Sequence, residues 1–273
     1  MGKLADLASV STADAQSFVY MPPLQAFDAT RILVKPNLGY PVGPPATVST
    51  AVLDKVLRGL RRANPNARIL VVEGVCSSAT AAEIFEKHGV YDLLDDNMRA
   101  TDAEDLLMED YPNLLENPVK YTQMTAPGYI GQYDCVISLG AFKRTLLNGE
   151  PLISASLKNL YGLFPREVYR ARSPNSRGQL HRPSVPEILK DIYFTVGHLF
   201  HGAVVDLTEK YVSPDWKPDR VRGVTEPVGK IVWGDDLLAV DEVACRIAGE
   251  PAASYIEPIR KLRADLRKKG VDV

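Results

Sequence analysis

Short apolar runs alternate with amphipathic segments along the chain, and this alternation predicts its secondary structure. Continuous apolar runs at residues 31–35 (RILVK) and 67–74 (ARILVVEG) predict two buried strands. Between them, residues 50–63 carry apolar side chains at helical spacing and predict a helix. A strand, a helix and a second strand in this order form a βαβ unit, in which the two strands run parallel.

The same alternation continues to the end of the chain. Apolar runs at residues 133–140, 202–207 and 229–234 predict three more strands. Residues 80–89 begin with the capping-box pattern TAAE and predict a helix, and residues 235–249 predict an amphipathic helix. The order of elements predicts an α/β fold with a largely parallel, Rossmann-like sheet and helices on both faces.

Length and hydrophobic content predict one domain. With 273 residues, of which 45% are hydrophobic, the chain is able to bury a sizeable core. We expect a single α/β domain over residues 1–273, with its core at about residues 30–250. Residues 92–118 are acidic and interrupted, and we predict a peripheral helical excursion there. Residues 166–182 form a basic loop.

Charge and cysteine content narrow the class of protein. A net charge of −2 gives no overall attraction to nucleic acid or to membranes. The three cysteines are far apart in sequence, which indicates free thiols and a reducing compartment. The chain starts without a secretion-signal pattern and lacks an apolar run of the roughly 20 residues that span a bilayer. We therefore expect a cytoplasmic protein without nucleic-acid or membrane partners; the sequence leaves its oligomeric state open.

Polar residues follow the carboxyl ends of the predicted strands. In strand order they are Lys35 and Asn37, then Glu73, then Lys143, then Asp206, and finally Asp235 and Asp236. Ligands of open parallel sheets bind outside the carboxyl ends of the strands, so we expect these side chains to converge on one crevice. The alternative is that strand ends simply meet solvent, where polar residues belong.

Asp241 stands out because it lies on the apolar face of its predicted helix. A buried, unpaired carboxylate costs several kcal/mol, so it needs a cationic or hydrogen-bonding partner. The candidate cations are Lys35, Lys143 and Lys158. The pair is either a structural ion pair or a Lys/Asp pair with perturbed pKa values at a functional crevice.

Two further stretches point to an anionic ligand. The apolar segment SASLKNLYGLFP (154–165) carries Lys158 and Asn159 in its middle, just before residues that break regular structure. The basic loop 166–182 follows at once and contains five arginines and His181, a composition suited to covering an anionic substrate. The loop GVCSSA (74–79) leads into a helix N-terminus, which favours anions; we take the cysteine in it as a bystander.

These motifs together resemble a known family. LVKPN, VVEG, DCVISLGAFK, SLKNLYGLFP, VVDL and DDLLAVDEVACRIAG occur in the order typical of the family known as domain of unknown function 362, over most of residues 30–250. The resemblance implies that the family's recurring polar residues correspond to Lys35, Asn37, Glu73, Lys143, Lys158, Asn159, His181, Asp206, Asp236 and Asp241. Many members also carry Lys where Ala141 stands, His where Thr145 stands and a ferredoxin-like cysteine motif; these departures weaken a redox role. The first strand–loop–helix segment is more weakly similar to that of the lactate-racemase type, which suggests acid/base chemistry beside a carboxylate.

From this pattern we expect a small-molecule enzyme that acts on an anionic, carboxylate- or phosphate-bearing metabolite by acid/base or group-transfer chemistry. The expected catalytic residues are Lys143, Lys158, Asp206 and Asp241. The expected substrate-binding residues are Lys35, Asn37, Glu73, Asn159, His181 and Asp236. The alternatives are a redox or cofactor-maturation protein working with an iron–sulfur partner, and a non-catalytic ligand-binding protein. The chain has no iron–sulfur motif, its cofactor is unknown, and the sequence leaves open whether a divalent ion bridges an aspartate to the ligand.

Overall fold

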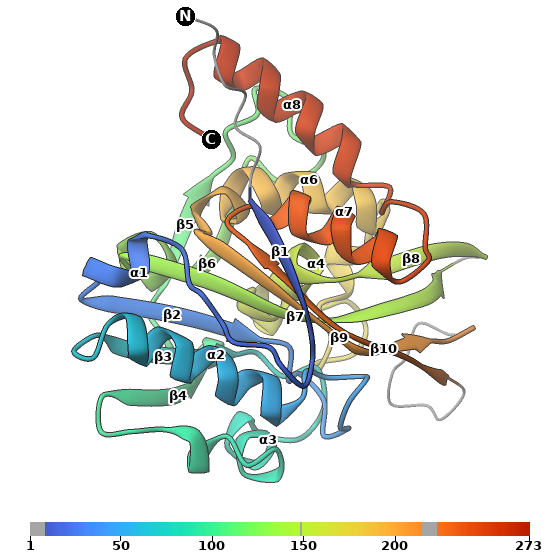
Figure 1. Ribbon diagram of the computed structural model, residues 1–273. Helices are drawn as coiled ribbons and strands as arrows, with labels where there is room; N and C mark the ends of the chain where they lie inside the picture. Colours follow the sequence, from blue (N-terminus) through green and yellow to red (C-terminus); the bar gives the residue numbers. More distant parts are fainter. Residues whose placement is uncertain (1–8, 148, 215–222) are drawn as a thin grey trace, which may run out of the picture.

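The structure is a computed structural model that describes residues 9–147, 149–214 and 223–273 (Figure 1). Its strands are β1 (Val10–Asp14), β2 (Arg31–Pro36), β3 (Arg68–Glu73), β4 (Met98–Asp102), β5 (Met108–Pro112), β6 (Gln123–Pro127), β7 (Cys135–Leu147), β8 (Glu150–Ser154), β9 (Gly202–Val212) and β10 (Val224–Gly234). Its helices are α1 (Gln25–Asp28), α2 (Thr50–Ala63), α3 (Ala81–Lys87), α4 (Ser156–Asn159), α5 (Arg166–Tyr169), α6 (Val185–Thr195), α7 (Leu237–Ile247) and α8 (Ile256–Lys268).

A mixed, mostly parallel sheet forms the centre of the fold. Five neighbouring strands, in the order β9, β7, β2, β3 and β4, run parallel to one another. On the β9 side, β10 and then β1 extend the sheet in antiparallel fashion, and β8 folds back as a hairpin on β7. A separate antiparallel pair is made by β5 and β6. The predicted α/β fold with a largely parallel sheet is confirmed.

Helices cover both faces of this sheet, because the buried strands are apolar on both sides. Successive side chains of a strand point to opposite faces, and β2 shows this directly. Ile32 and Val34 pack into the cluster that includes the apolar sides of α2 and α3, whereas Leu33 packs into the cluster of α4, α6 and α7. In Figure 1, α2 and α3 lie on one side of the sheet and α6 and α7 lie on the other.

The direction of the last predicted strand is the main correction. β10 pairs antiparallel with β9, so its carboxyl end lies at the opposite edge of the sheet from those of the parallel strands. Parallel neighbours need a long crossover, usually a helix, and residues 213–223 (SPDWKPDRVRG) lack an apolar helical pattern. Asp236 therefore does not join the other strand-end residues. It caps the N-terminus of α7 through Ala239 N and forms an ion pair with Arg263.

The acidic segment 92–118 is also built differently from the prediction. Instead of a helical excursion it contains β4, which forms the outer edge of the main sheet, and β5, which belongs to the small sheet. Between them lies a single 3₁₀ turn at Ala103–Asp105, capped by Asp102. This turn carries Glu104 toward the basic loop.

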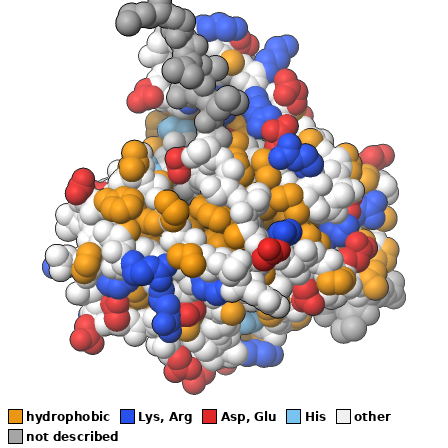
Figure 2. Space-filling model, viewed as in Figure 1, with side chains coloured by type: hydrophobic (Ala, Val, Ile, Leu, Met, Phe, Trp, Pro, Cys, Tyr) orange, Lys and Arg blue, Asp and Glu red, His pale blue; other side chains and the backbone are white. Residues whose placement is uncertain are grey.

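Part of the surface is apolar. Figure 2 shows hydrophobic side chains gathered across the face that carries β1 and α1. Of the large hydrophobic side chains that are exposed, four lie within nine residues of each other: Val19, Met21, Leu24 and Phe27. Within the described ranges, no helix is both long and apolar enough to cross a membrane.

Candidate functional site

The candidate site lies where the order of the parallel strands reverses. From β2 the chain moves outward to β3 and β4, and it then returns to place β7 on the other side of β2. Such a switch point, at the carboxyl ends of the strands, is where open α/β sheets bind ligands. Lys35 at the end of β2 is paired in register with Ser138 of β7, and α4 packs against β7 above them. The site therefore combines the end of β2, the middle of β7 and α4.

A buried ion pair forms the floor of the site. Lys35 Nζ lies 2.6 Å from Glu73 Oε1, and both side chains are almost completely buried. The Glu73 carboxylate also accepts hydrogen bonds from the backbone N–H groups of Gly74 and Leu38. Burial lowers the pKa of Lys35, and the charge of Glu73 opposes this shift. Because the two groups satisfy each other, they support the site from beneath rather than offer themselves to a ligand.

Asn159 ties three segments together. Its Oδ1 accepts hydrogen bonds from Lys35 Nζ at 3.0 Å and from Asn37 Nδ2 at 3.3 Å. Its Nδ2 donates to the carbonyl oxygen of Lys35 at 2.7 Å and to Ser138 Oγ at 3.0 Å. These protein groups occupy both ends of the amide, which is only 4% exposed. Asn159 therefore joins β2, β7 and α4.

Two glycines allow the segments around the ion pair to approach each other. Gly162 lies in the 3₁₀ turn that follows α4, and a Cβ added there would meet the Glu73 carboxylate and, at 2.8 Å, Lys35 Nζ. A Cβ added to Gly74 would collide with the carbonyl oxygen of Gly162 and with the guanidinium of Arg177. The spacing LKN-x-x-G thus places a residue without a side chain directly on the buried pair.

Lys143 lies near the buried Lys35–Glu73 ion pair, and its ammonium is hydrogen-bonded to neutral groups. Its ammonium donates to Asn37 Oδ1 at 2.7 Å and to the carbonyl oxygen of Ala46 at 2.7 Å. Burial, together with a smaller effect of the nearby charge of Lys158, lowers the pKa of Lys143 to about 7. Among the residues that the structure describes, no carboxylate lies within ion-pair distance of this ammonium. The protonated Lys143 therefore carries a positive charge that forms no ion pair within the described residues.

Lys158 is the second such lysine, and it is less constrained. Its side chain is partly exposed, and its ammonium lies over the ring of Tyr161, 4.5 Å from the ring centre. Within the described chain, neither a hydrogen-bond acceptor nor a carboxylate contacts this ammonium. Burial lowers the pKa of Lys158 to about 8. A large fraction of this amine is thus neutral slightly above neutral pH.

His181 reaches the same cluster from the basic loop. Its ring meets the ring of Tyr161 edge to face at 5.4 Å. Nδ1 lies 3.3 Å from the carbonyl oxygen of Arg177, and because a carbonyl only accepts, Nδ1 carries the proton and Nε2 has a free lone pair. Burial, together with the charge of Lys158, lowers the pKa of His181 to about 4. The imidazole is therefore neutral at physiological pH.

The sequence did not single out the residues that anchor the basic loop. Arg177 is buried and donates to the carbonyl oxygen of Val75 at 2.9 Å and to Cys76 Sγ at 3.2 Å. Arg166 forms an ion pair with Glu104 at 2.8 Å, and Glu104 also lies 3.5 Å from Arg177. The arginines were recognisable only as a group, because composition does not tell a buried guanidinium from a solvated one.

Asp241 is buried, as its position on the helix predicted, but the expected lysine partner is wrong. Its carboxylate accepts hydrogen bonds from Ser156 N at 2.8 Å, Ser156 Oγ at 2.6 Å, Leu157 N at 3.1 Å and Tyr255 Oη at 2.8 Å. Burial raises the pKa of Asp241, and these hydrogen bonds oppose the shift. The carboxylate thus holds the first turn of α4, the helix that carries Lys158. These contacts position α4, and the catalytic role expected for Asp241 stays a prediction.

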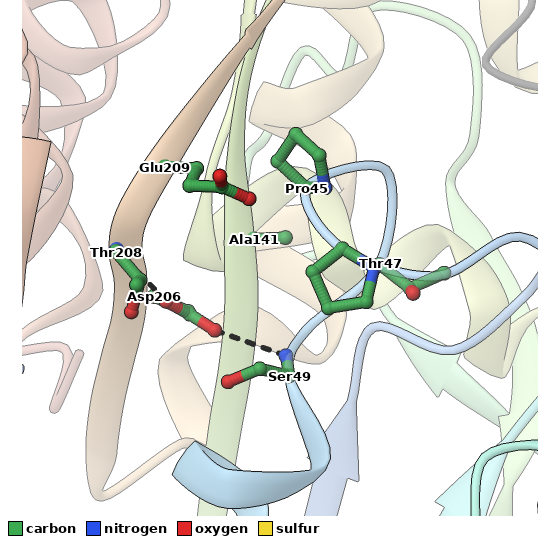
Figure 3. Close-up of a pocket in the computed structure, with 8 residues that line it drawn as sticks. Pro45, Thr47, Ser49, Ala141, Asp206, Thr208 and Glu209 are labelled. Atoms are coloured by element: carbon green, nitrogen blue, oxygen red, sulfur yellow. Dashed lines mark hydrogen bonds between the residues drawn. The ribbon is translucent and has the colours of Figure 1, made fainter. Parts of the chain in front are cut away.

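Asp206 is likewise separate from the lysines. It accepts hydrogen bonds from the backbone N–H groups of Ser49 at 3.0 Å and Thr208 at 2.9 Å. It lines a cavity of about 180 Å³ together with Ala141, Glu209 and the loop that carries Pro45 and Thr47 (Figure 3). Burial is the main cause of the lowered pKa values of Lys143 and Lys158. Through Ala46, the cavity loop does contact Lys143.

The arrangement as a whole carries an excess of positive charge. Its cationic side chains are Lys35, Lys143, Lys158, Arg166 and Arg177. The carboxylates that pair with them are Glu73 and Glu104. Four residues near the lysines are partly exposed, so solvent reaches the cluster: Asn37, Cys76, Lys158 and His181. An anion is the ligand that this charge distribution favours.

Comparison with known proteins identifies the family. The model of the family described as domain of unknown function (DUF362) matches residues 32–246, and the chain therefore belongs to this family. No curated protein matches the sequence. Among solved structures, the fold is similar to the lactate racemase apoprotein from Thermoanaerobacterium thermosaccharolyticum, with a TM-score of 0.45 and 14% sequence identity. That similarity covers 74% of this chain and 47% of the other, so this chain spans about half the length of that protein.

Proposed function

We propose that this member of the family is an enzyme that binds a small anionic metabolite between Lys143 and Lys158 and transfers a proton or a group within it. The observation that carries the proposal is the pair of neighbouring ammonium groups that no carboxylate of the described chain contacts. Two like charges in a partly buried place repel each other, as the lowered pKa of Lys143 reflects. A bound carboxylate or phosphate relieves this repulsion.

The two lysines are suited to different roles. Lys143 has three N–H donors and uses two of them on Asn37 and Ala46, which leaves one for the ligand. Lys158 has a pKa of about 8, close to the working pH, where a general acid or base is most effective. His181, with a free Nε2 lone pair, is positioned as an acceptor at the same place.

Calorimetric titration with a panel of small carboxylates and phosphates at low salt tests the binding part of the proposal. We expect Lys143→Met to weaken binding by about ten-fold or more, since a hydrogen bond to a charged group contributes about 1.5–3 kcal/mol. Lys190→Met is the matched control, because Lys190 is a helix-surface lysine paired with Glu187, and it should leave binding unchanged. Equal affinity in wild type and Lys143→Met, or an absence of binding to wild type, contradicts the proposal.

The catalytic part needs a separate readout. We expect the bound anions that have an acidic C–H bond to incorporate deuterium from solvent, and we expect Lys158→Met to abolish this exchange. Nuclear magnetic resonance measures the incorporation. A chain that binds the anion tightly but exchanges no proton and converts none of the panel would instead be a ligand-binding protein. That outcome would support the proposed binding site and refute the proposed catalytic activity.

A further inference from the structure

We infer that Lys158 is an amine nucleophile that forms an imine with the carbonyl carbon of its ligand, so that the substrate class is an oxo acid. This inference rests on the proposed function and names the chemistry of the same site. The geometry points to Lys158 because its side chain is partly exposed and its ammonium lies over the face of Tyr161, 4.5 Å from the ring centre. No acceptor within the described residues would have to be given up when the amine forms a bond to carbon.

Lys143 serves as the contrast that decides which lysine reacts. Its ammonium is held by Asn37 Oδ1 and by the carbonyl oxygen of Ala46, each at 2.7 Å, and its side chain is 9% exposed. Attack by this nitrogen would take the donor from the partly buried amide oxygen of Asn37 and from the buried carbonyl oxygen of Ala46, and an unsatisfied buried group costs about 1–3 kcal/mol. Lys143 is therefore suited to hold the carboxylate of the ligand with its remaining N–H.

A lysine desolvated by burial is an established way to obtain a neutral amine near neutral pH. Burial lowers the pKa of Lys158 to about 8. At pH 7.5 its neutral fraction is roughly two orders of magnitude above that of a lysine with the usual value of about 10.4. Lys143 has a pKa lowered to about 7, and a ligand carboxylate bound beside it would favour the protonated form of this amine.

The step is balanced without any oxidant or reductant. The lone pair of the neutral Lys158 amine forms a bond to the carbonyl carbon, and the carbonyl π pair moves to oxygen, which takes up a proton. The nitrogen gives up one proton to solvent, which yields the neutral carbinolamine, and the hydroxyl group then takes up a second proton from solvent. The nitrogen lone pair forms C=N as the C–O bond breaks, and the oxygen leaves as water. The protonated imine then withdraws electrons from the neighbouring carbon. This lowers the energy needed to remove a proton or a carboxyl group there.

Reductive trapping tests the inference on the full-length protein. Glyoxylate, the smallest α-oxo acid, is incubated with the protein and sodium cyanoborohydride at pH 7.5, and carboxymethylation of each lysine is followed by peptide mass spectrometry. We expect Lys158 to be modified at least ten-fold faster than the exposed Lys261, with a rate that rises with pH through about 8. Lys158→Arg should remove the fast-reacting site, whereas Lys261→Arg, on the protein surface, should leave it unchanged.

Each other outcome decides against the inference. Modification of Lys158 at the rate of Lys261, in a protein that still binds anions, overturns the imine and leaves the proposed function standing. Preferential modification of Lys143 overturns the assignment of the nucleophile. If the protein neither binds anions nor reacts preferentially at any lysine, both the imine and the proposed function fail.

Discussion

The contact of Gly162 with the buried ion pair makes a sharp prediction about Gly162→Ala. The backbone of Gly162 does not require a positive φ, so the effect of the new methyl group is steric alone. That methyl group would meet Glu73 Oε1 and would lie 2.8 Å from both Nζ and Cε of Lys35. Under 3.0 Å something has to move, and the neighbours are the two charged ends of a buried pair rather than a free side chain.

The magnitude follows from two known costs. Overpacking a well-packed interior costs about 1–3 kcal/mol, and removing one partner from a buried ion pair costs about 3–5 kcal/mol. Because the pair is displaced rather than lost, we expect Gly162→Ala to lower the free energy of unfolding by about 3 kcal/mol. Urea unfolding followed by circular dichroism measures this, and an unchanged slope against urea confirms that the change lies in stability.

Two controls separate this cause from a general effect of losing a glycine. Gly43→Ala adds a methyl group that meets no atom within 4 Å, and it should change stability by less than about 1 kcal/mol. In a Lys35→Met, Glu73→Gln background the collision involves no charged pair, so the cost of Gly162→Ala should shrink by at least about 1 kcal/mol. A cost below about 0.5 kcal/mol, or full additivity in that background, would refute the steric explanation.

Two further changes test other parts of the site. The pKa of Lys143 is lowered to about 7 in the folded protein, so the folded state binds fewer protons than the unfolded state between that pH and about 10.4. Relative to Lys143→Met, wild type should therefore gain up to about 1.4 kcal/mol of stability per pH unit from pH 7 upward and none below about pH 6. A difference in urea midpoints that stays flat across this range would contradict the assigned shift. Asp241→Asn places an amide NH₂ against donors from Ser156, Leu157 and Tyr255, so it should lower the free energy of unfolding in urea by about 2–4 kcal/mol. The control Asp54→Asn, on the surface of α2, should be near neutral. Equal effects of the two variants would show that the buried contacts of Asp241 contribute little to stability.

The sequence was sufficient wherever a feature depends on nearby residues. The first βαβ unit followed from apolar runs and helical spacing, and the burial of Asp241 followed from its position on one face of a helix. It was insufficient for the partner of Asp241, because a helix face identifies which side is buried but not which segment packs against it. The apolar run of β10 does not encode the direction of the strand; the signal lay in the segment before it, which lacks the apolar helical pattern of a parallel crossover.

Lys158 and Asn159 show the same limit at a single dipeptide. Their place inside an apolar segment indicated that both side chains point toward the protein rather than into solvent. Consecutive residues of a helix nevertheless face directions about 100° apart. Asn159 turns into the floor and is enclosed by β2 and β7, whereas Lys158 faces Tyr161 and remains partly exposed. Only the position of α4 in the fold distinguishes these two outcomes.

The hydrogen bond from Lys35 to Asn159 joins residues 124 positions apart in the chain. During synthesis at about 5–20 residues per second, Lys35 therefore precedes Asn159 by on the order of ten seconds. Through that interval the Lys35 and Glu73 side chains exist without the segment that covers them, and water solvates their charges. A nascent chain that ends before α4 has no site to offer a ligand. An anion bound at the proposed site would consequently stabilise the finished protein without assisting the early steps of its folding.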